Sequence, residues 1–474
     1  MIRTRLALPL ALLPAAPFAT DAQRPAATAA APAPAAPAWA ASLDSLVQRE
    51  MTRTRTPGVS LAVVHEGRVV YAQGYGVTNI ESGERVTRET LFRLGSVTKM
   101  FTGALLAQLE VAKLVDLEAP IGRYVTELQG RVATVNTRQL LTHHAGWIDN
   151  AVAYGRMGES ALGEVMREVT DTMFFTDPGA VYSYSNPGFS MAGYVAERAG
   201  AARFATLLER MVLRPSGMPR ATFKPLEALT FSASQGHLAA GAAAPVSLVR
   251  PFTENTAQWA AGFLMASAEE VARFTMVLMD SGRANGATVL SPAAVTRMTT
   301  PYVVPPGSAP ADSAGYGFGV MTMRRGGRLS WQHGGSINGF DAQVVMLPAT
   351  RTSVVLIDNL SGAPLNGVVD AALRLAAGVT PLAPAAAPAP RAPTAAERAA
   401  LVGRYAMGAR SVIIRDEGGT LQASQGGAAS PVQMIGDDAF AIATPNGTMR
   451  FALQRDAAGQ VRYLHTGGRS LARQ

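Results

Sequence analysis

The sequence predicts an α/β (α+β) protein in which an antiparallel sheet is flanked by helices and carries an inserted helical lobe. A small C-terminal all-β domain is expected to follow it. Three observations support this prediction. β-rich runs lie near both ends of residues 41–378, helical periodicity fills the middle, and residues 396–474 alternate short β runs with Gly, Asp and Asn turns. Strands at both ends of a helix-rich segment favour one sheet closed by the two ends of the domain.

The N-terminus has the features of a secretory signal peptide. A basic start, MIRTR, precedes an apolar run at residues 6–19 that contains three prolines and is too short to span a bilayer. We therefore expect a signal peptide over residues 1–22, export to the periplasm or the medium, and no membrane span in the mature chain. Ala/Pro-rich linkers are expected at residues 23–40 and 379–395.

The large domain is expected to open with a hairpin. GVSLAVVHEGRVVYAQGYG holds two β-rich runs that meet at Glu66-Gly67. From Ser96 onward, apolar residues recur at spacings of three and four, which predicts a helix. The later elements are a helix and two strands, at residues 274–280, 342–348 and 353–359.

Composition excludes several classes of function. The net charge of +8 is carried by scattered Arg, without a basic run or a basic-aromatic stripe, so we expect no nucleic-acid partner. The absence of Cys excludes disulfides, thiolate catalysis and cysteine-ligated zinc. Adjacent His143 and His144 point apart on a helix and have no convergent acidic partners in the sequence. We expect neither a metal nor another cofactor.

The first candidate site is GSVTKMF, residues 95–101. If Ser96 begins a helix, Lys99 lies one turn later on the same face, where its amine can reach the serine hydroxyl. A serine needs a neighbouring base to become a nucleophile, and Lys can release its proton where Arg cannot. The chain has only three lysines among its 42 Lys and Arg residues. The alternative is that Ser96 only caps the helix and Lys99 lies on the surface.

The second candidate site is Y-x-N at Tyr184 and Asn186. A phenol facing Lys99 is expected to have its pKa lowered by the ammonium, so that it acts as general base and then as acid toward the leaving group. Asn186 is expected to hydrogen-bond both Lys99 and a substrate carbonyl. The alternative is an ordinary turn, which these residue types also favour.

The third candidate site is HGGS at residues 333–336. His333 precedes Gly334 and Gly335, and consecutive glycines let a strand backbone approach a ligand closely. The backbone amide of Ser336 is then expected to pair with that of Ser96 as an oxyanion hole.

These motifs resemble, in order, the S-x-x-K, the Y-x-N and the K-T-G equivalent of serine β-lactamases and penicillin-binding proteins, in the class C branch. LFRLGSVTKMFTGALLAQL, LLTHHAG, PGAVYSYSNPGFSMAGYVAE and AAGFLMASAEEVARF extend the resemblance over about residues 41–378. It implies a β-lactamase/transpeptidase-like fold, acylation of Ser96, and proton transfer shared by Lys99 and Tyr184. Residues 396–474 resemble, more loosely, a lipocalin-like β domain.

One position departs from the family pattern. β-Lactamases of this family place Lys at the start of the strand motif, where it meets the substrate carboxylate, whereas this chain has His333. A neutral imidazole attracts a carboxylate much less. We therefore expect an exported serine hydrolase that cleaves ester or amide bonds of small molecules or peptides, similar to esterases and D-aminopeptidases. The alternatives are a class C-like β-lactamase and a slowly acylating penicillin-binding or peptide-sensing module.

Overall fold

The structure, a computed structural model, describes residues 36–149, 156–241, 244–308, 314–362, 365–379, 389–444 and 447–474. The expected signal peptide, most of the first linker and the middle of the second lie outside these ranges. Within the described ranges, no helix has the length and apolar character needed to cross a bilayer.

The large domain of residues 41–378 is built on one seven-stranded antiparallel sheet, and an antiparallel sheet is what the sequence predicts. Its strand order is β2-β1-β13-β12-β11-β10-β9, and every described pairing is antiparallel. Because β1 pairs with β13, the two ends of the domain close the sheet. The strands are β1 (Gly58–His65), β2 (Arg68–Gly76), β9 (Gly315–Tyr316), β10 (Met321–Arg325), β11 (Arg328–Ile337), β12 (Phe340–Leu347) and β13 (Thr352–Asp358).

The predicted hairpin is confirmed, and it is tight. Glu66 and Gly67 both have positive φ angles, 51° and 76°, which is the backbone of a two-residue turn that follows the strand twist. The predicted strands near residues 342–348 and 353–359 are β12 and β13, and the helix predicted at residues 274–280 is the second half of α9 (Ala268–Met279).

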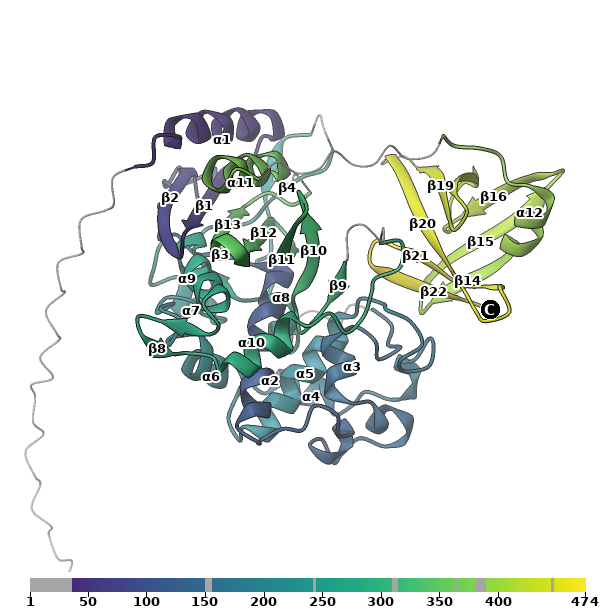
Figure 1. Ribbon diagram of the computed structural model, residues 1–474, viewed down its shortest axis with the longest axis horizontal. Coiled ribbons are helices and arrows are strands. Elements are labelled where there is room, and N and C mark those ends of the chain that lie inside the picture. Colours follow the sequence, from purple (N-terminus) through teal and green to yellow (C-terminus); the bar gives the residue numbers. More distant parts are fainter. Residues whose placement is uncertain are drawn as a thin grey trace, which may run out of the picture. The chain divides into compact units, whose positions relative to one another are not determined.

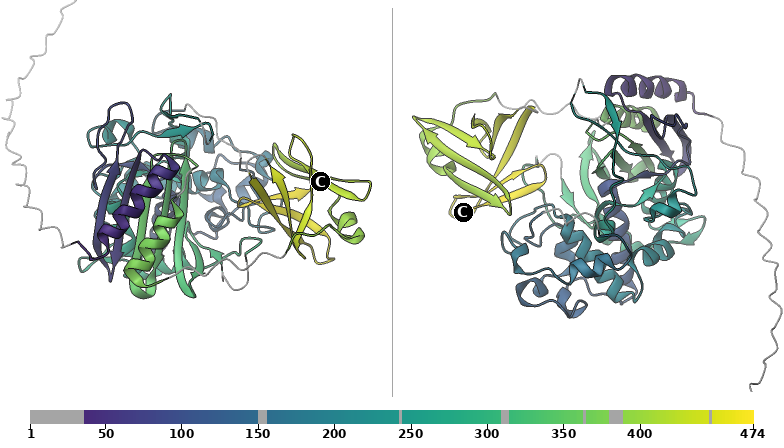
Figure 2. Two further views of the ribbon diagram at one scale, coloured as in Figure 1. Left: turned by 90° about the horizontal axis from the view of Figure 1, so that it is seen from above. Right: turned by 180° about the vertical axis from the view of Figure 1, so that it is seen from behind.

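Helices cover both faces of this sheet. Helices α1 (Ala40–Thr54) and α11 (Asn366–Ala377) lie side by side on one face, as Figure 2 shows, and α9 lies on the other. Val59, Leu61 and Val63 of β1 belong to the core under α1 and α11, whereas Ala62 and Val64 join the larger core on the opposite face. This alternation leaves β1 almost wholly buried, because both of its faces are covered.

The middle of the chain forms the inserted helical lobe (Figure 1). It begins at the site motif: residues Gly95–Val97 form a 3₁₀ turn, and the α-helix starts two residues later than Ser96. The helices are α2 (Thr98–Val111), α3 (Thr137–Leu141), α4 (Ala161–Met166), α5 (Asn186–Ala199), α6 (Phe204–Leu208), α7 (Pro225–Ala228), α8 (Trp259–Gly262) and α10 (Pro292–Thr299). Short strand pairs join it, β3 (Phe92–Arg93) with β6 (Met265–Ala266), β4 (His237–Ala239) with β5 (Val246–Leu248), and β7 (Arg283–Ala284) with β8 (Ala287–Thr288).

The C-terminal domain is a nine-stranded antiparallel sheet with order β17-β16-β15-β14-β22-β21-β20-β19-β18. Its two edge strands are consecutive in the chain, so the sheet is nearly closed on itself and resembles a barrel. Its strands are β14 (Gly403–Met407), β15 (Arg410–Glu417), β16 (Thr420–Ser424), β17 (Ser430–Pro431), β18 (Gln433–Gly436), β19 (Ala439–Thr444), β20 (Gly447–Arg455), β21 (Val461–Thr466) and β22 (Arg469–Arg473).

The start of this domain differs from the expectation in two respects. Residues 389–395 were expected to be linker, but Arg391 forms a β-bridge with Met434 and an ion pair with Glu397. A helix, α12 (Ala395–Leu401), then precedes the strands, so the domain is not purely β. The sequence signal was local: the Thr394 side chain and Glu397 form a capping box, which stabilises a helix start.

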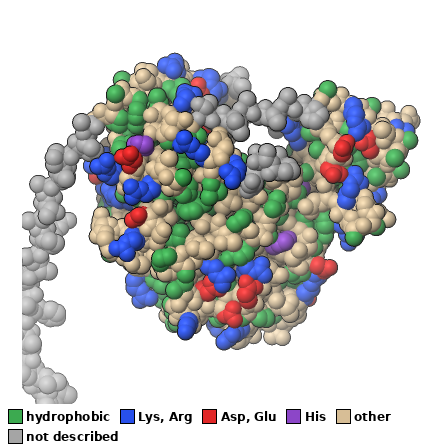
Figure 3. Space-filling model, viewed as in Figure 1, with side chains coloured by type: hydrophobic (Ala, Val, Ile, Leu, Met, Phe, Trp, Pro, Cys, Tyr) green, Lys and Arg blue, Asp and Glu red, His purple; other side chains and the backbone are tan. Residues whose placement is uncertain are grey.

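Charged side chains are mixed on the molecular face shown in Figure 3. Lys and Arg side chains lie among Asp and Glu side chains there and do not form one continuous basic surface. This distribution agrees with the scattered arginines of the sequence, which gave no indication of a nucleic-acid site.

Candidate active site

Ser96 lies in a turn that packs directly against strand β11. Gly95 has a φ of 50°, and a Cβ atom added to it would lie 2.7 Å from the backbone nitrogen of Ser336. A Cβ added to Gly335 would lie 2.0 Å from the Leu94 carbonyl oxygen and 3.1 Å from the Ser96 nitrogen. Both glycines are therefore needed for close approach of the two backbones. The amides of Ser96 and Ser336 consequently lie near each other, as an oxyanion hole requires.

Lys99 is fully buried and reaches Ser96. Its Nζ lies 3.1 Å from Ser96 Oγ, 2.7 Å from Asn186 Oδ1 and 2.6 Å from the Ala261 carbonyl oxygen. The last two oxygens can only accept hydrogen bonds. A neutral amine therefore uses its two N–H groups on Asn186 and Ala261, and its lone pair is left for the Ser96 hydroxyl. This is the geometry of a base that accepts the serine proton.

The electrostatics of the site favour that neutral form. Burial holds the pKa of Lys99 well below its usual value, the Arg469 cation lowers it further, and the Asp149 carboxylate opposes both effects. Arginine could not take this role, because its guanidinium stays protonated in proteins.

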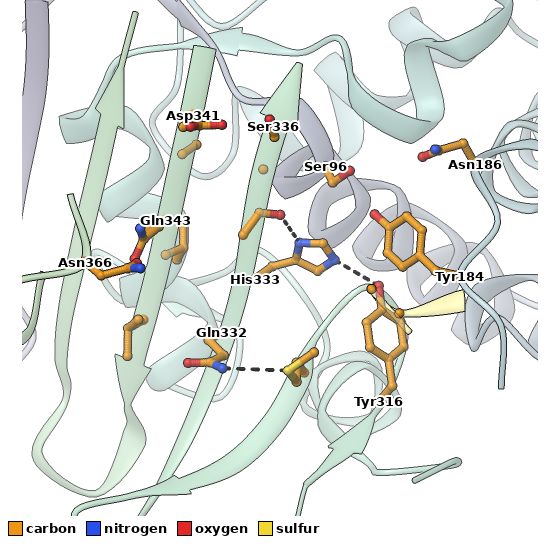
Figure 4. Close-up of a pocket in the computed structure, with 18 of the residues that line it drawn as sticks. Ser96, Tyr184, Asn186, Tyr316, Gln332, His333, Ser336, Asp341, Gln343 and Asn366 are labelled. Atoms are coloured by element: carbon orange, nitrogen blue, oxygen red, sulfur yellow. Dashed lines mark hydrogen bonds between the residues drawn. The ribbon is translucent and has the colours of Figure 1, made fainter. Parts of the chain in front are cut away.

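Tyr184 lies with its hydroxyl toward Ser96 (Figure 4). Its ring is partly exposed, but the hydroxyl is buried and, among the described residues, makes no hydrogen bond of normal geometry. Burial raises the pKa of Tyr184 well above its usual range, and the Ser96 hydroxyl lowers it by less. The expectation that Lys99 would lower this pKa was therefore wrong. Desolvation dominates over any effect of Lys99, whose Nζ lies 4.7 Å from the ring centroid.

Asn186 begins helix α5, and the local sequence explains its position. The Ser185 side chain accepts a hydrogen bond from the Gly188 amide, and Pro187 occupies the first turn of the helix. Ser185 is therefore a helix N-cap, and the ordinary turn considered for this motif is not what the structure shows. This helix start brings Asn186 Oδ1 to Lys99, which is the contact expected from the sequence.

His333 lies in a chain of hydrogen-bonded rings rather than free in the cavity. The Ser185 amide donates to His143 Nδ1 (3.1 Å), which places the His143 proton on Nε2, 3.2 Å from Tyr316 Oη. Tyr316 in turn lies 2.9 Å from His333 Nε2, and His333 Nδ1 lies 2.5 Å from the Gly334 carbonyl oxygen. His143 Nε2–H thus donates to Tyr316, Tyr316 O–H to His333 Nε2, and His333 Nδ1–H to the carbonyl.

Both histidines are held neutral by their surroundings. Burial lowers the pKa of His333 to about 4, and the charge of Lys99 acts in the same direction. Burial also lowers the pKa of His143 well below its usual value. His333 therefore carries no charge at neutral pH and does not replace the family lysine as a cation.

Asp149 and Arg469 also belong to the site, although no sequence motif identified them as site residues. Arg469 begins β22 in the C-terminal domain and donates to Asp149 Oδ2 from Nε (2.9 Å) and Nη2 (2.6 Å). The preceding turn contacts the motif as well, since the Tyr184 amide donates to the Gly468 carbonyl oxygen at 2.9 Å. Arg469 follows Tyr184 by 285 residues, and neither Asp149 nor Arg469 matches a catalytic pattern, so only the structure assigns them to the site.

Two cavities flank Ser96, and both are lined by Asn186 and Ser336 as well. The first, of about 750 Å³, extends along β11 and β12 and is drawn in Figure 4. Its polar lining residues include Arg325, Gln332, Asp341, Gln343 and Asn366, and its apolar ones include Met321, Val344 and Val345. The second, of about 670 Å³, is lined by apolar side chains such as Leu248, Phe252 and Phe263 and by polar ones such as Arg250, Glu254 and Gln258. A substrate bound across Ser96 would thus meet both polar and apolar groups on each side.

Known proteins share this arrangement of sequence and fold. The D-aminopeptidase of Gluconobacter oxydans (strain 621H) is 26% identical over 326 residues, which cover 68% of this chain and 59% of that protein. The esterase EstB of Burkholderia gladioli is 29% identical over 197 residues, which cover 38% of this chain and 50% of that protein. The chain therefore spans about three fifths of the D-aminopeptidase and half of the esterase.

A solved structure supports the fold over most of the chain. SurE, in its structure with D-Leu, matches with a TM-score of 0.74 at 23% identity, covering 92% of this chain and 99% of that chain. At this identity the likeness shows the fold alone. The sequence model of the family described as Beta-lactamase matches residues 43–379, which is more than half of the chain. The protein therefore belongs to the β-lactamase family.

Proposed function

We propose that the protein is an exported serine hydrolase that cleaves ester or amide bonds through an acyl-serine intermediate, with D-amino-acid derivatives as the substrate class. The observation that carries this proposal is the position of buried Lys99 Nζ, which lies 3.1 Å from Ser96 Oγ and also contacts the acceptor-only oxygens of Asn186 and Ala261.

The reaction follows from these contacts. The Ser96 hydroxyl gives its proton to Lys99 Nζ while its oxygen bonds to the substrate carbonyl carbon, and the amides of Ser96 and Ser336 hold the resulting oxyanion. The bond to the leaving group then breaks, and the proton passes from Lys99 through the Tyr184 hydroxyl to that group. Water attacks the acyl-serine with the same groups reversed, which releases the acid and restores Ser96.

The substrate class rests on the cavities and the relatives. The two cavities beside Ser96, of about 750 and 670 Å³, leave room for the acyl part of a substrate on one side and a peptide-sized leaving group on the other, and each offers polar and apolar contacts. One relative is named a D-aminopeptidase and another an esterase, and a SurE structure that covers 92% of this chain was determined with D-Leu. Hydrolysis of D-amino-acid amides and esters agrees with all three.

A class C-like β-lactamase is the second candidate, and the charges along the cleft disfavour it. β-Lactams carry a carboxylate that family enzymes bind with a cation, but His333 is neutral. The two arginines that line the β11 side are each paired, Arg325 with Asp370 and Arg469 with Asp149. A β-lactam carboxylate would have to displace one of these partners.

The test compares three chromogenic substrates with the full-length protein: a short-chain p-nitrophenyl ester, D-alanyl p-nitroanilide and a chromogenic cephalosporin. The proposal expects turnover of the first two, loss of turnover in Ser96→Ala, and an acyl adduct on Ser96 detected by mass spectrometry. A β-lactamase would instead turn over the cephalosporin, with a further gain in His333→Lys. A slowly acylating binding module would give one stoichiometric burst and then no turnover.

Export remains part of the proposal and is supported by the basic start and apolar run of residues 1–19. Expression of the full chain with a C-terminal tag, followed by fractionation and N-terminal sequencing, tests it. A mature chain outside the cytoplasm that starts near residue 23 is expected, whereas an uncleaved cytoplasmic chain would contradict export.

A further inference from the structure

Asp149 lies between the Asn186 amide and the Arg469 guanidinium, and its two oxygens serve different partners. Oδ1 accepts hydrogen bonds from Asn186 N (2.9 Å) and Asn186 Nδ2 (3.1 Å). Oδ2 accepts from Nε (2.9 Å) and Nη2 (2.6 Å) of Arg469. The Asp149 side chain is only 5% exposed, so these contacts replace solvent almost completely.

This arrangement fixes which way the Asn186 amide faces. An ionised carboxylate only accepts hydrogen bonds, so the side of Asn186 that meets Asp149 must be the NH₂ group. The amide oxygen then faces Lys99 Nζ at 2.7 Å. If the amide were reversed, its NH₂ would face Lys99, and a neutral amine would have to spend its lone pair on Asn186 instead of on Ser96. The orientation of one amide therefore decides whether Lys99 can act as a base.

Arg469 makes a buried carboxylate tenable at this position. A nearly buried carboxylate without a partner is costly, and a guanidinium that donates two hydrogen bonds satisfies it. The C-terminal domain holds Arg469 in place through neighbouring contacts. The Ser470 amide donates to Ser183 Oγ (3.1 Å), and Ser470 Oγ donates to the Tyr182 carbonyl oxygen (2.9 Å).

We infer that Arg469 and Asp149 are a positioning pair through which the C-terminal domain holds the Asn186 amide oxygen toward Lys99 and so directs the lysine lone pair at Ser96. This inference rests on the proposed role of Lys99 as the base for Ser96. It gives the C-terminal domain a part in the reaction of the other domain, although neither Arg469 nor Asp149 touches the reacting atoms.

The first test measures the titration of Lys99 directly and needs no substrate. Because the chain has three lysines, selective ¹³C,¹⁵N-lysine labelling gives three side-chain NMR signals, which Lys113→Arg and Lys224→Arg variants assign. The other titratable groups that face Lys99 are Tyr184, His143 and His333, and they are present in every variant compared.

The two members of the pair are expected to move this titration in opposite directions. Arg469→Ala removes a cation and leaves Asp149 unpaired, so the pKa of Lys99 rises. Asp149→Asn removes the anion, so the pKa falls. The acid limb of kcat/KM is expected to follow in both variants. Arg469→Gln, which keeps a hydrogen-bond donor of similar size, is expected to shift the titration upward as well and serves if Arg469→Ala folds poorly.

The second test is kinetic. Misplacement of a catalytic group by about 1 Å costs on the order of 10²-fold in rate, so kcat for the ester is expected to fall by about that factor in Arg469→Ala and in Asp149→Asn. The matched control is Arg462→Ala, which removes an exposed arginine from β21 of the same hairpin and is expected to retain the wild-type rate and Lys99 titration.

Opposite shifts of the Lys99 signal with reduced kcat in both variants would support the inference. An unchanged Lys99 titration in Arg469→Ala and Asp149→Asn would overturn it, whether or not the rates fall. Shifts in the same direction would also overturn it, since they would indicate general disturbance of the site. The NMR result stands even if no substrate is turned over, so failure of the proposed function is distinguishable from failure of this inference.

Discussion

Protonation of His333 is expected to destabilise the domain of residues 41–378 as the pH falls below 6.5. The unfolded chain takes up the imidazole proton near pH 6.5, whereas the folded chain takes it up only near pH 4, because the ring is buried. Since the folded-state pKa is the lower one, the stability present at neutral pH is lost as the pH falls from 6.5 toward 4. Below pH 4 both states are protonated and the loss levels off.

The size of this effect follows from the two pKa values. They differ by about 2.5, and each pKa unit is worth about 1.4 kcal/mol, so the limiting loss is roughly 3 kcal/mol. At pH 4 the folded state is half protonated, and the loss from pH 7 is about 3 kcal/mol. His333 is 8% exposed, so solvent screens this contribution little.

Urea unfolding followed by tryptophan fluorescence measures it, because all four tryptophans precede residue 379. The wild type and His333→Gln are compared from pH 7 to pH 4. The glutamine variant keeps an acceptor for Tyr316 but does not titrate, so its free energy of unfolding is expected to fall by about 3 kcal/mol less than that of the wild type. Parallel curves for the two proteins would refute the argument that His333 is buried and neutral.

Three further predictions concern the site itself. Lys99→Arg is expected to lower kcat by about 10³-fold at every pH from 6 to 9. A general base typically contributes a factor of about 10² to 10⁴ to the rate, and Arg cannot release its proton. Ester hydrolysis near the wild-type rate would exclude Lys99 as the base. Tyr184→Phe is expected to lower kcat by about 10²-fold, because the proton relay is lost. Tm is not expected to fall, because the lost hydroxyl is buried and makes no hydrogen bond of normal geometry among the described residues. A clear fall in Tm would show that the hydroxyl has a structural partner. Gly335→Ala is expected to lower Tm and slow labelling of the site serine by a fluorophosphonate, since the new Cβ would lie 2.0 Å from the Leu94 carbonyl oxygen. Gly334→Ala is the control, because its Cβ would lie 3.9 Å from its nearest neighbour, the Ala342 carbonyl oxygen; equal effects of the two substitutions would contradict the close approach of the backbones.

Much of the fold was predictable because its signals are local. The Glu66-Gly67 turn is encoded by a glycine, which adopts positive φ freely, between two β-rich runs, and the strands and α9 are encoded by their hydrophobic period. Because the β-rich runs lie at both ends of the domain, pairing its first and last strands was the simplest way to form one sheet. The start of the C-terminal domain was missed because Ala/Pro composition outweighed the capping box of Thr394 and Glu397.

The candidate site likewise has features that depend on local sequence and features that depend on tertiary structure. The spacing of Ser96 and Lys99 within one turn is local and was expected from the sequence, whereas the Ser185 cap that starts α5 is equally local but was not predicted. The direction of the Tyr184 pKa was not, because it depends on desolvation by residues from several elements, which no spacing reveals.

The sequence by itself determined which side chains this protein has for acyl-serine chemistry and the backbone turns that carry them. Tertiary structure alone decided how those side chains are charged and aimed. Burial holds the pKa of Lys99 well below its usual value and lowers that of His333 to about 4, and Arg469, 320 residues from Asp149 in the chain, completes the contacts that orient Asn186. The physical reason is that hydrogen-bond direction and desolvation depend on all the groups surrounding an atom, and the fold gathers those groups from distant parts of the sequence.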